Sequence, residues 1–224
     1  MFAVLAVRAS AIPPIRDCLS IKSAIIDDFF DELTMSIELQ PFSEIYDKAG
    51  EGGTPDTTKS EYYEAGDIPF IKIDDLKHKY VIANKDYING LGLQKSSAWM
   101  VPANSIIYSN GATIGAMSIN TYPISTKQGI LGIVPKKSIS IEFLYYLMSS
   151  TYFKKQIHRI ITYGTMATAY LKDINQIKVP IPCISEQDKI ANRLCKISEK
   201  VDIEQTILSH WYSQKQYLFR QMFI

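Results

Sequence analysis

Two short polar segments carry side chains suited to binding a polyanion. Ser125–Gly129 offers hydroxyl, ammonium and amide groups before a predicted strand, and Tyr163–Lys172 combines small residues with Thr, Tyr and Lys. Small side chains let a backbone approach a phosphate closely, and hydroxyl and ammonium groups donate hydrogen bonds to it. Gln can pair with adenine and Lys with guanine in the major groove, although two ordinary loops are the alternative interpretation. The candidate base-reading residues are Ser109, Asn110, Lys127, Gln128, Thr165, Thr168 and Tyr170.

The charge distribution points to the same part of the chain. The formal net charge is only +1, but residues 136–178 hold seven Lys or Arg and two Asp or Glu, whereas residues 1–66 hold five and twelve. A local charge of +5 suits a surface that faces a polyanion, and a solvated face is the alternative. The candidate phosphate contacts are Lys136, Lys137, Lys154, Lys155, Arg159 and Lys172.

Motifs for catalysis are missing from the sequence. The glycine-rich segment 50–55 has no GK[ST], so it is not a phosphate-binding loop, and 111–115 lacks the third glycine of a dinucleotide fingerprint. His78, His158 and His210 are far apart, which argues against a metal site. Asp74-Asp75 near Lys77 is interpreted as a solvated turn rather than a nuclease carboxylate pair. We therefore expect no catalytic, cofactor-binding or metal-binding residues, and a free-standing nuclease is the least favoured hypothesis.

Composition limits the class of protein. The chain has 224 residues, of which 46% are apolar and 21% charged, which is typical of a globular protein. Its apolar runs fall short of the roughly 20 residues that a membrane-spanning helix needs. Three scattered cysteines argue against a secreted disulfide scaffold. We expect a cytoplasmic protein with no membrane partner.

The predicted fold class is α+β, with a strand-rich domain followed by a long C-terminal helix. Apolar spacing predicts an N-terminal helix over 13–37 and a second helix over 141–163, which carries the basic residues. Between and after these, short apolar runs bounded by turn residues predict strands. The predicted strands are 68–73, 80–82, 105–108, 116–119, 129–134 and 176–179.

The segment 185–223 has a different pattern. Apolar residues keep a 4-3 spacing, and neither Pro nor Gly occurs after Pro182. A helix of about 37 residues would be roughly 55 Å long, too long to pack wholly on a small domain. A 3.5-residue repeat indicates a coiled coil, and an ordinary long surface helix is the alternative. The expected coiled-coil interface consists of Ile190, Leu194, Ile197, Val201, Leu208, Trp211, Leu218 and Met222.

The order of several short motifs resembles the specificity (S) subunit of type I restriction-modification systems over about residues 38–224. Each motif is weak alone, but their order and spacing together are specific. They are Gly52-Gly53-Thr54-Pro55, Tyr62-Tyr63, Gly66-Asp67-Ile68-Pro69-Phe70-Ile71, Gly92-Leu93 with Ser96-Ser97, Ala112-Thr113-Ile114-Gly115, Lys127-Gln128-Gly129, and Ile181-Pro182 leading to Glu186-Gln187 and Ile190-Ala191.

The resemblance implies a non-catalytic subunit that binds double-stranded DNA. Subunits of this family dock modification (methyltransferase) subunits and, through them, restriction subunits that cleave DNA using ATP. A typical S subunit has two recognition domains and two long helices, whereas this chain has one of each. The expected division is a helical segment 1–37, a DNA target-recognition domain 38–184 and a spacer or dimerisation helix 185–224.

Three interpretations remain open. A homodimer formed through the C-terminal helix would read two half-sites at most about 16 base pairs apart, from 55 Å at 3.4 Å per base pair. Alternatively, the chain is a coiled-coil assembly module with negligible DNA binding of its own, or an inactive truncated remnant of an S subunit.

Overall fold

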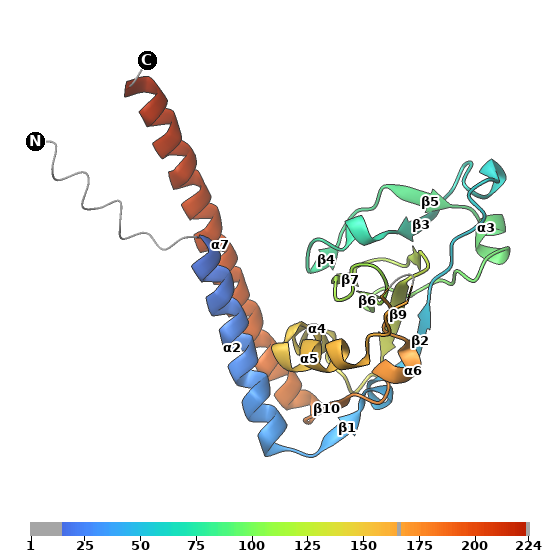
Figure 1. Ribbon diagram of the computed structural model, residues 1–224, viewed down its shortest axis with the longest axis horizontal. Helices are drawn as coiled ribbons and strands as arrows, with labels where there is room; N and C mark the ends of the chain where they lie inside the picture. Colours follow the sequence, from blue (N-terminus) through green and yellow to red (C-terminus); the bar gives the residue numbers. More distant parts are fainter. Residues whose placement is uncertain (1–14, 165–166, 223–224) are drawn as a thin grey trace, which may run out of the picture.

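The computed structural model describes residues 15–164 and 167–222, which form a rod beside a strand-rich body (Figure 1). The rod consists of α7 (Ile184–Met222) and the shorter α2 (Ile15–Ser36), which run antiparallel. The body consists of two sheets and the helices that join them to the rod. The predicted α+β class, with a strand-rich domain before a long helix, is confirmed.

The main sheet has five strands in the order β2-β9-β6-β7-β4. It is antiparallel except that β4 pairs in parallel with β7. Because β9 and β6 are buried almost throughout, they are nearly continuous apolar runs. The strands are β2 (Tyr46–Glu51), β4 (Tyr80–Val81), β6 (Ile106–Ser109), β7 (Met117–Asn120) and β9 (Ile130–Pro135).

A smaller sheet and a strand pair complete the body. The smaller sheet has the order β5-β3-β8, and β1 pairs antiparallel with β10. Short helical turns connect these strands. The elements are β1 (Leu39–Pro41), η1 (Phe42–Ile45), η2 (Ser60–Tyr62), β3 (Ile68–Ile71), η3 (Ile73–Asp75), β5 (Asp86–Ile88), α3 (Gly90–Gln94), β8 (Ser125–Thr126), α6 (Leu171–Ile174) and β10 (Lys178–Pro180).

The six predicted strands correspond to β3, β4, β6, β7, β9 and β10, with ends displaced by at most two residues. Four strands were not predicted: β1, β2, β5 and β8. β2 has the sequence YDKAGE, and apolar and polar residues do not alternate along it. It therefore lacks the two-residue period by which a strand is recognised. β1, β5 and β8 have two or three residues each, too few to show a period.

The expected single helix over 141–163 is wrong, because the chain breaks at Ser150 into α4 (Ile141–Ser149) and α5 (Thr151–Ile160). Ser150 has extended backbone angles, φ −65° and ψ 152°, so it cannot continue α4. Its hydroxyl accepts a hydrogen bond from the Phe153 N–H at 3.3 Å, which caps α5. The break turns the basic helix away from the direction of α4.

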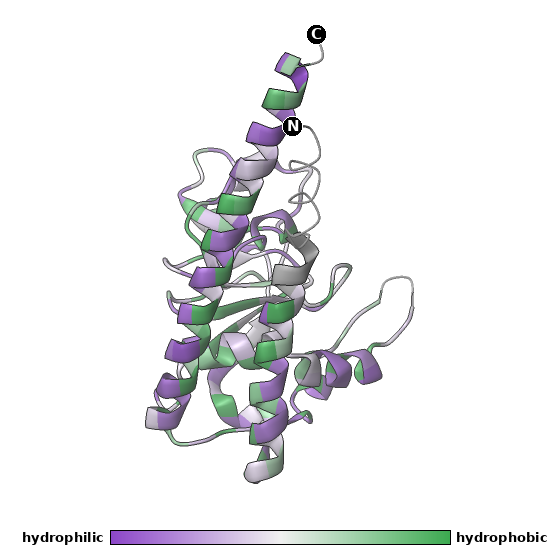
Figure 2. Ribbon diagram, turned by 90° about the vertical axis from the view of Figure 1, so that its left-hand side faces the viewer, coloured by the Kyte–Doolittle hydropathy of each residue, from purple (hydrophilic) through white to green (hydrophobic). Residues whose placement is uncertain are grey.

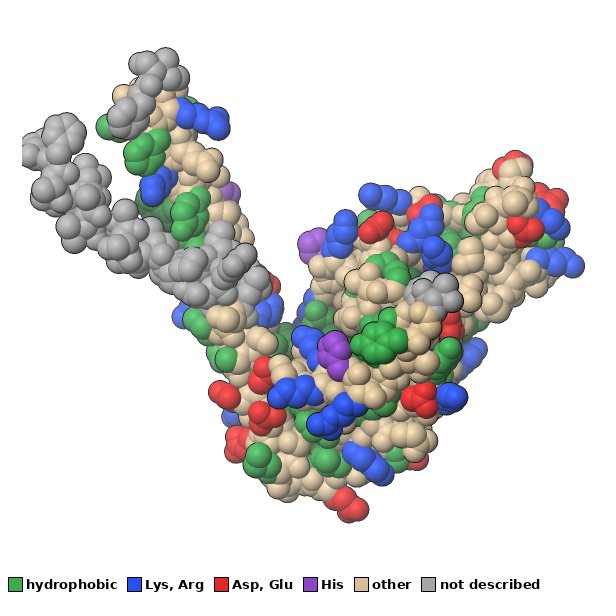
Figure 3. Space-filling view, in the orientation of Figure 1, with side chains coloured by type: hydrophobic (Ala, Val, Ile, Leu, Met, Phe, Trp, Pro, Cys, Tyr) green, Lys and Arg blue, Asp and Glu red, His purple; other side chains and the backbone are tan. Residues whose placement is uncertain are grey.

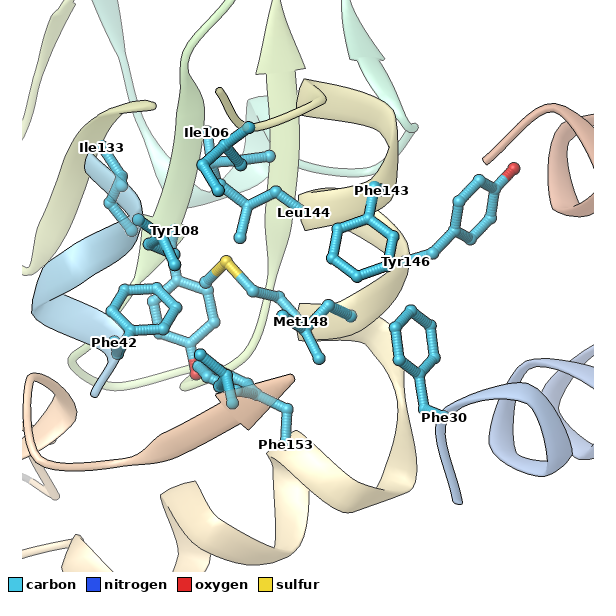
Figure 4. Packing of buried hydrophobic residues seen from close by; sticks show 14 of the residues in the cluster. Phe30, Phe42, Ile106, Tyr108, Ile133, Phe143, Leu144, Tyr146, Met148 and Phe153 are labelled. Atoms are coloured by element: carbon cyan, nitrogen blue, oxygen red, sulfur yellow. The ribbon is translucent and has the colours of Figure 1, made fainter. Parts of the chain in front are cut away.

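The main core lies between the sheet, α4, α5 and the rod. Phe30 of α2 packs against Phe143 of α4 with ring centres 5.5 Å apart, and Phe42 packs against Phe153 of α5 at 5.4 Å (Figure 4). These rings are at most 1% exposed. Aromatic pairs with this spacing stabilise a core beyond their area burial. The first pair holds α2 on α4, and the second holds α5 on η1, the turn that precedes β2.

The predicted apolar stripe of α7 is divided between two environments. Ile190 and Leu194 are buried in the core of their own chain, where α7 contacts α2 and α4. For these two positions the expected interface with a second copy is corrected, because α2 and α4 already cover them. Trp211, Leu218 and Met222 are 62%, 57% and 69% exposed. Figure 2 shows apolar turns continuing along the part of α7 that projects beyond the body.

Candidate nucleic-acid interface

Four loops meet at one end of the five-stranded sheet, and we call this surface the loop end. β2 and β6 finish here while β9 and β7 begin here, because neighbouring strands are antiparallel. The Gly53 N–H donates to the Thr126 carbonyl at 3.0 Å, and the Asn110 N–H donates to the Gly129 carbonyl at 3.0 Å. The Ala169 N–H donates to the Asn110 carbonyl at 2.9 Å. The loop end comprises residues 52–55, 110–116 and 126–129, together with 162–164 and 167–170 of the loop after residue 160.

Glycines make the close approach of these loops possible. A Cβ on Gly52 would lie 2.0 Å from the Thr126 carbonyl oxygen, so no other residue fits there without moving the backbone. Gly129 has a φ of +84°, a conformation that favours glycine. Gly52 and Gly129 therefore allow the strand connections 52–55 and 126–129 to lie against their neighbours.

Lys127 and Gln128 project from the middle of the loop end, and both are exposed. Their backbone is held on three sides. The Lys127 N–H donates to the Ile71 carbonyl at 3.0 Å, the Gln128 N–H to the Thr54 hydroxyl at 3.4 Å, and the Gly129 N–H to the Glu51 carboxylate at 2.7 Å. An exposed ammonium and an exposed amide on a fixed backbone suit the reading of base edges.

Ser109 and Asn110 lie beneath this surface rather than on it. They are 0% and 1% exposed. The Ser109 hydroxyl donates to the Gly111 carbonyl at 3.4 Å, and the Asn110 amide donates to the Ala169 carbonyl at 3.3 Å. Because a buried side chain cannot reach a base edge, the expected DNA contact of these two residues is corrected. Asn110 instead joins its loop to the loop after α5, and Ser109 bonds within its own turn.

The loop after α5 adds aromatic groups to the loop end. Thr162 and Thr168 exchange backbone hydrogen bonds of 2.9 and 3.1 Å, which closes the loop. Tyr170 is 47% exposed, and the ammonium of Lys172 lies 5.6 Å from its ring centre. Thr165 lies outside the described residues.

Tyr163 was not singled out from the sequence. It is 79% exposed, and an exposed aromatic ring can stack on a base. The sequence did contain a signal for base stacking at this position, because Tyr163 is an aromatic residue beside Gly164 in the most basic part of the chain.

The basic helix α5 leads into this loop. Phe153 and Ile157 are buried, while Lys154, Lys155 and Arg159 are exposed on the opposite side. In Figure 3 the Lys and Arg side chains gather with a histidine on the face of the body that adjoins the rod. This is the arrangement expected of an electrostatic surface for phosphates.

Lys136 and Lys137 lie elsewhere. They follow the carboxyl end of β9, whereas the loop end is at its amino end. The ammonium of Lys136 forms an ion pair with Glu44 at 3.2 Å. These two lysines are therefore separated from the loop end by the length of a strand, about 16 Å for five residue steps.

The described residues offer no evident metal centre or membrane span. Among residues 15–164 and 167–222, no three His, Cys, Asp or Glu side chains are grouped as a metal ion would require. No helix in that part of the chain is both long and apolar enough to cross a bilayer.

The family model described as "Type I restriction modification DNA specificity domain" matches residues 37–210. The chain belongs to this family. This confirms the resemblance that the motifs indicated and includes every residue of the loop end.

Two curated relatives are similar over much of the chain. The type I restriction enzyme MjaIX specificity subunit of Methanocaldococcus jannaschii is 28% identical over 168 residues, covering 74% of this chain and 38% of the relative. The EcoR124I/EcoR124II specificity subunit of Escherichia coli is 30% identical over 151 residues, covering 65% and 37%. The matched part of this chain thus spans less than two fifths of either relative.

Solved structures share the fold. A chain from a study described as "Structural basis underlying complex assembly and conformational transition of the type I R-M system" has a TM-score of 0.73 at 17% identity, covering 96% of this chain and 52% of that one. The HsdS subunit from Thermoanaerobacter tengcongensis has a TM-score of 0.63 at 18% identity, covering 89% and 47%. The rod and the body together therefore match about half of each solved chain.

Proposed function

We propose that this chain is a non-catalytic DNA-recognition part of a type I restriction-modification complex. In this proposal the loop end reads the bases of one half-site, and the exposed side of α5 holds the DNA backbone. The observation that carries it is the meeting of four loops beside a basic helix in a member of the specificity-domain family. We place this function in the cytoplasm, the compartment expected from the sequence.

The proposed base-reading residues are Lys127, Gln128, Thr168 and Tyr170, with Tyr163 added from the structure. The proposed phosphate contacts are Lys154, Lys155, Arg159 and Lys172. A phosphate contact contributes equally to every DNA sequence, whereas a base contact contributes only to the correct one. The two groups can therefore be separated by experiment.

The central experiment selects bound sequences from a random DNA library and measures affinity against salt concentration. Lys154→Gln or Arg159→Gln should weaken binding to all sequences and reduce the slope of log affinity against log salt by about 0.9 each. Lys127→Ala and Gln128→Ala should instead reduce discrimination by about 1–3 kcal/mol per contact. Lys137→Gln is the matched control, because that lysine lies at the other end of β9. If Lys127→Ala and Gln128→Ala leave sequence preference intact, the loop end is not the reading surface.

The proposed partners are modification subunits, restriction subunits reached through them, and a second copy of this chain. Residues 38–184 would form the recognition domain and 185–224 the spacer helix. The exposed apolar residues of the outer part of α7 support an interface there, because Ile203, Trp211 and Leu218 are 60%, 62% and 57% exposed.

The same exposed face also favours a second candidate, in which the chain is an assembly module with negligible DNA binding of its own. Measuring DNA affinity with and without the modification subunit separates the two. Specific binding by the isolated chain supports the reader, and binding that requires the modification subunit supports the module. A chain that neither binds DNA nor joins the modification subunit would be a truncated remnant.

A further inference from the structure

Lys79 extends from the loop before β4 to α4 and α7. Its ammonium forms an ion pair with Glu142 of α4 and lies 3.2 Å from the Tyr146 hydroxyl and 3.2 Å from the Cys195 sulfur of α7. The Tyr146 hydroxyl donates to Ser198 of α7 at 3.2 Å. We call these five residues the Lys79 cluster. It links the strand at the edge of the main sheet to the long helix.

Aromatic rings surround the ammonium. It lies 4.5 Å from the ring centre of Tyr146, 5.4 Å from that of Tyr145 and 5.3 Å from that of Tyr80. The Tyr80 hydroxyl donates to the other oxygen of Glu142 at 2.6 Å. Cation–π contacts of this kind strengthen as water is excluded, and the Lys79 side chain is only 21% exposed.

The charged form of Lys79 is favoured in this setting. Burial by itself lowers the pKa of Lys79, but the hydrogen bonds and charges of Glu142 and Tyr146 outweigh burial and raise its pKa above the ordinary value. A lysine with this environment carries its charge at any physiological pH, so the link between β4 and α7 persists.

A second polar contact holds the start of α7. Gln187 is fully buried, and its side-chain oxygen accepts from the Ser140 N–H at 2.9 Å. Its amide donates to the Ser138 carbonyl at 3.1 Å and the Pro182 carbonyl at 2.8 Å. Gln187 and Ser198 are eleven residues apart, about 16 Å along a helix. Because α7 is attached at two separated points, its angle to the body is fixed.

The Lys79 cluster borders a cleft between the rod and the body. The cleft has a volume of about 530 Å³, and Lys22, Tyr145 and Asp202 are among its lining residues. Figure 4 shows Tyr146 pointing away from the core residues Phe143 and Leu144, on the side where α7 lies. If the cluster were removed, the cleft would leave room for the body to rotate relative to α7 about the apolar contact with Ile190 and Leu194.

A small rotation here moves the end of the rod far. Leu194 and Met222 are 28 residues apart, about 42 Å, so a rotation of about 10° about Leu194 displaces the end by ~7 Å. That distance corresponds to about two base pairs. The angle between body and rod is thus an additional determinant of half-site separation, besides the length of α7.

We propose that Lys79 is a positioning residue that sets the angle between the recognition domain and α7, and thereby the spacing at which two half-sites are read. The spacing part of this inference rests on the proposed function. The angle part concerns the chain alone.

The angle is measured without DNA. Spin labels attached through noncanonical residues replace the exposed Asp67 of the body and Ser213 of α7, and labelled protein is diluted into unlabelled protein so that only distances within one chain count. Double electron–electron resonance then gives the distance distribution. Lys79→Met should shift or widen it by about 5 Å or more. Lys79→Arg, which keeps the charge, should stay close to the native distribution.

Two further variants control for the loss of an unrelated ion pair and for a failure of Lys79→Met to fold. Lys72→Met removes an ion pair with Asp86 at 2.7 Å inside the body and should leave the distribution unchanged. Tyr146→Phe keeps the ring but removes the hydroxyl that joins Lys79 to Ser198, so it should widen the distribution even if Lys79→Met fails to fold. Native distributions for both Lys79→Met and Tyr146→Phe would overturn the proposal.

The spacing is measured with a DNA library of paired half-sites separated by different numbers of base pairs. Lys79→Met should accept a broader range of spacings while each half-site keeps its base preference. A wider distance distribution with an unchanged spacing preference would overturn the spacing part of the inference. If native protein selects no spacing at all while the distance distribution responds to Lys79→Met, the positioning role stands and the proposed two-site reading fails.

Discussion

Gln187 shows how a single polar side chain can fix the start of a long helix. It makes three hydrogen bonds to the backbone of two other segments while fully buried. A buried polar group left without its partner costs about 1–3 kcal/mol, more than an average hydrogen bond contributes. The side chain therefore matters mainly for the backbone groups that it satisfies.

We predict that Gln187→Leu lowers the free energy of unfolding by about 2–4 kcal/mol, because one N–H and two carbonyls lose their partner. Urea unfolding followed by circular dichroism measures the change. Gln214→Leu is the matched control on the exposed part of the same helix and should change stability by less than about 0.5 kcal/mol. Equal losses in the two variants would contradict this role for Gln187.

The tyrosines around Lys79 predict a pH dependence at the alkaline end. Burial and a hydrogen bond to Glu142 raise the pKa of Tyr80 to about 12, and burial is the main cause that raises the pKa of Tyr146 to about 12. Above about pH 10 the unfolded chain releases these protons while the folded chain retains them. The stability that these two tyrosines contribute to the folded state is therefore fully present below about pH 10, and it is lost as the pH rises to about 12.

This loss of stability can be followed by thermal unfolding between pH 9 and pH 12. Tyr80→Phe should make the decline shallower, because one titrating group is removed. Tyr217→Phe, on the exposed outer part of α7, should leave the slope unchanged. A stability that stays constant through this range would contradict the prediction.

At the level of the helices, the break at Ser150 separates two tasks that one continuous helix could not perform. α4 carries Phe143 and Leu147 into the core against α7, whereas α5 turns its basic side outward. In one continuous helix the apolar stripe of Phe143 and Leu147 would fall on Lys154 and His158, whereas the buried residues of α5 are Phe153 and Ile157, so the phase of the pattern changes at the break. The signal that was overlooked is a serine directly before the start of a second amphipathic segment, a common N-cap.

The length of α7 sets the separation of the two half-sites in the proposed function. Deleting one heptad, residues 208–214, shortens the helix by about 10 Å. The preferred spacer should shorten by about three base pairs at 3.4 Å each. The half-site sequences should not change, and selection from a library of spacer lengths tests both expectations. An unchanged preferred spacer would show that the length of α7 does not set the half-site separation.

For the whole molecule, the exposed outer half of α7 predicts association of two chains. Trp211→Glu combined with Leu218→Glu should weaken the dimer, because charges buried in an apolar interface are strongly unfavourable. We expect the double variant to be a single chain at micromolar concentration. Sedimentation equilibrium measures the mass. Ser213→Glu with Gln216→Glu, on the other side of the same helix, is the matched control and should remain dimeric. A native protein of single-chain mass at every concentration would contradict the dimer.

The sequence by itself determined the elements whose signal is local. Continuous apolar runs located β6 and β9, the 4-3 apolar repeat, interrupted at Glu204 and Lys215, located α7, and the ordered motifs identified the family. Only the tertiary structure decided which ends of these elements meet. It brought segments 52–55, 110–116 and 126–129 together, buried Ser109 and Asn110 beneath them, and placed Lys136 at the opposite end of β9. The reason is that a local period reports which side of a strand is buried, whereas strand order and register depend on pairing between residues far apart in the chain.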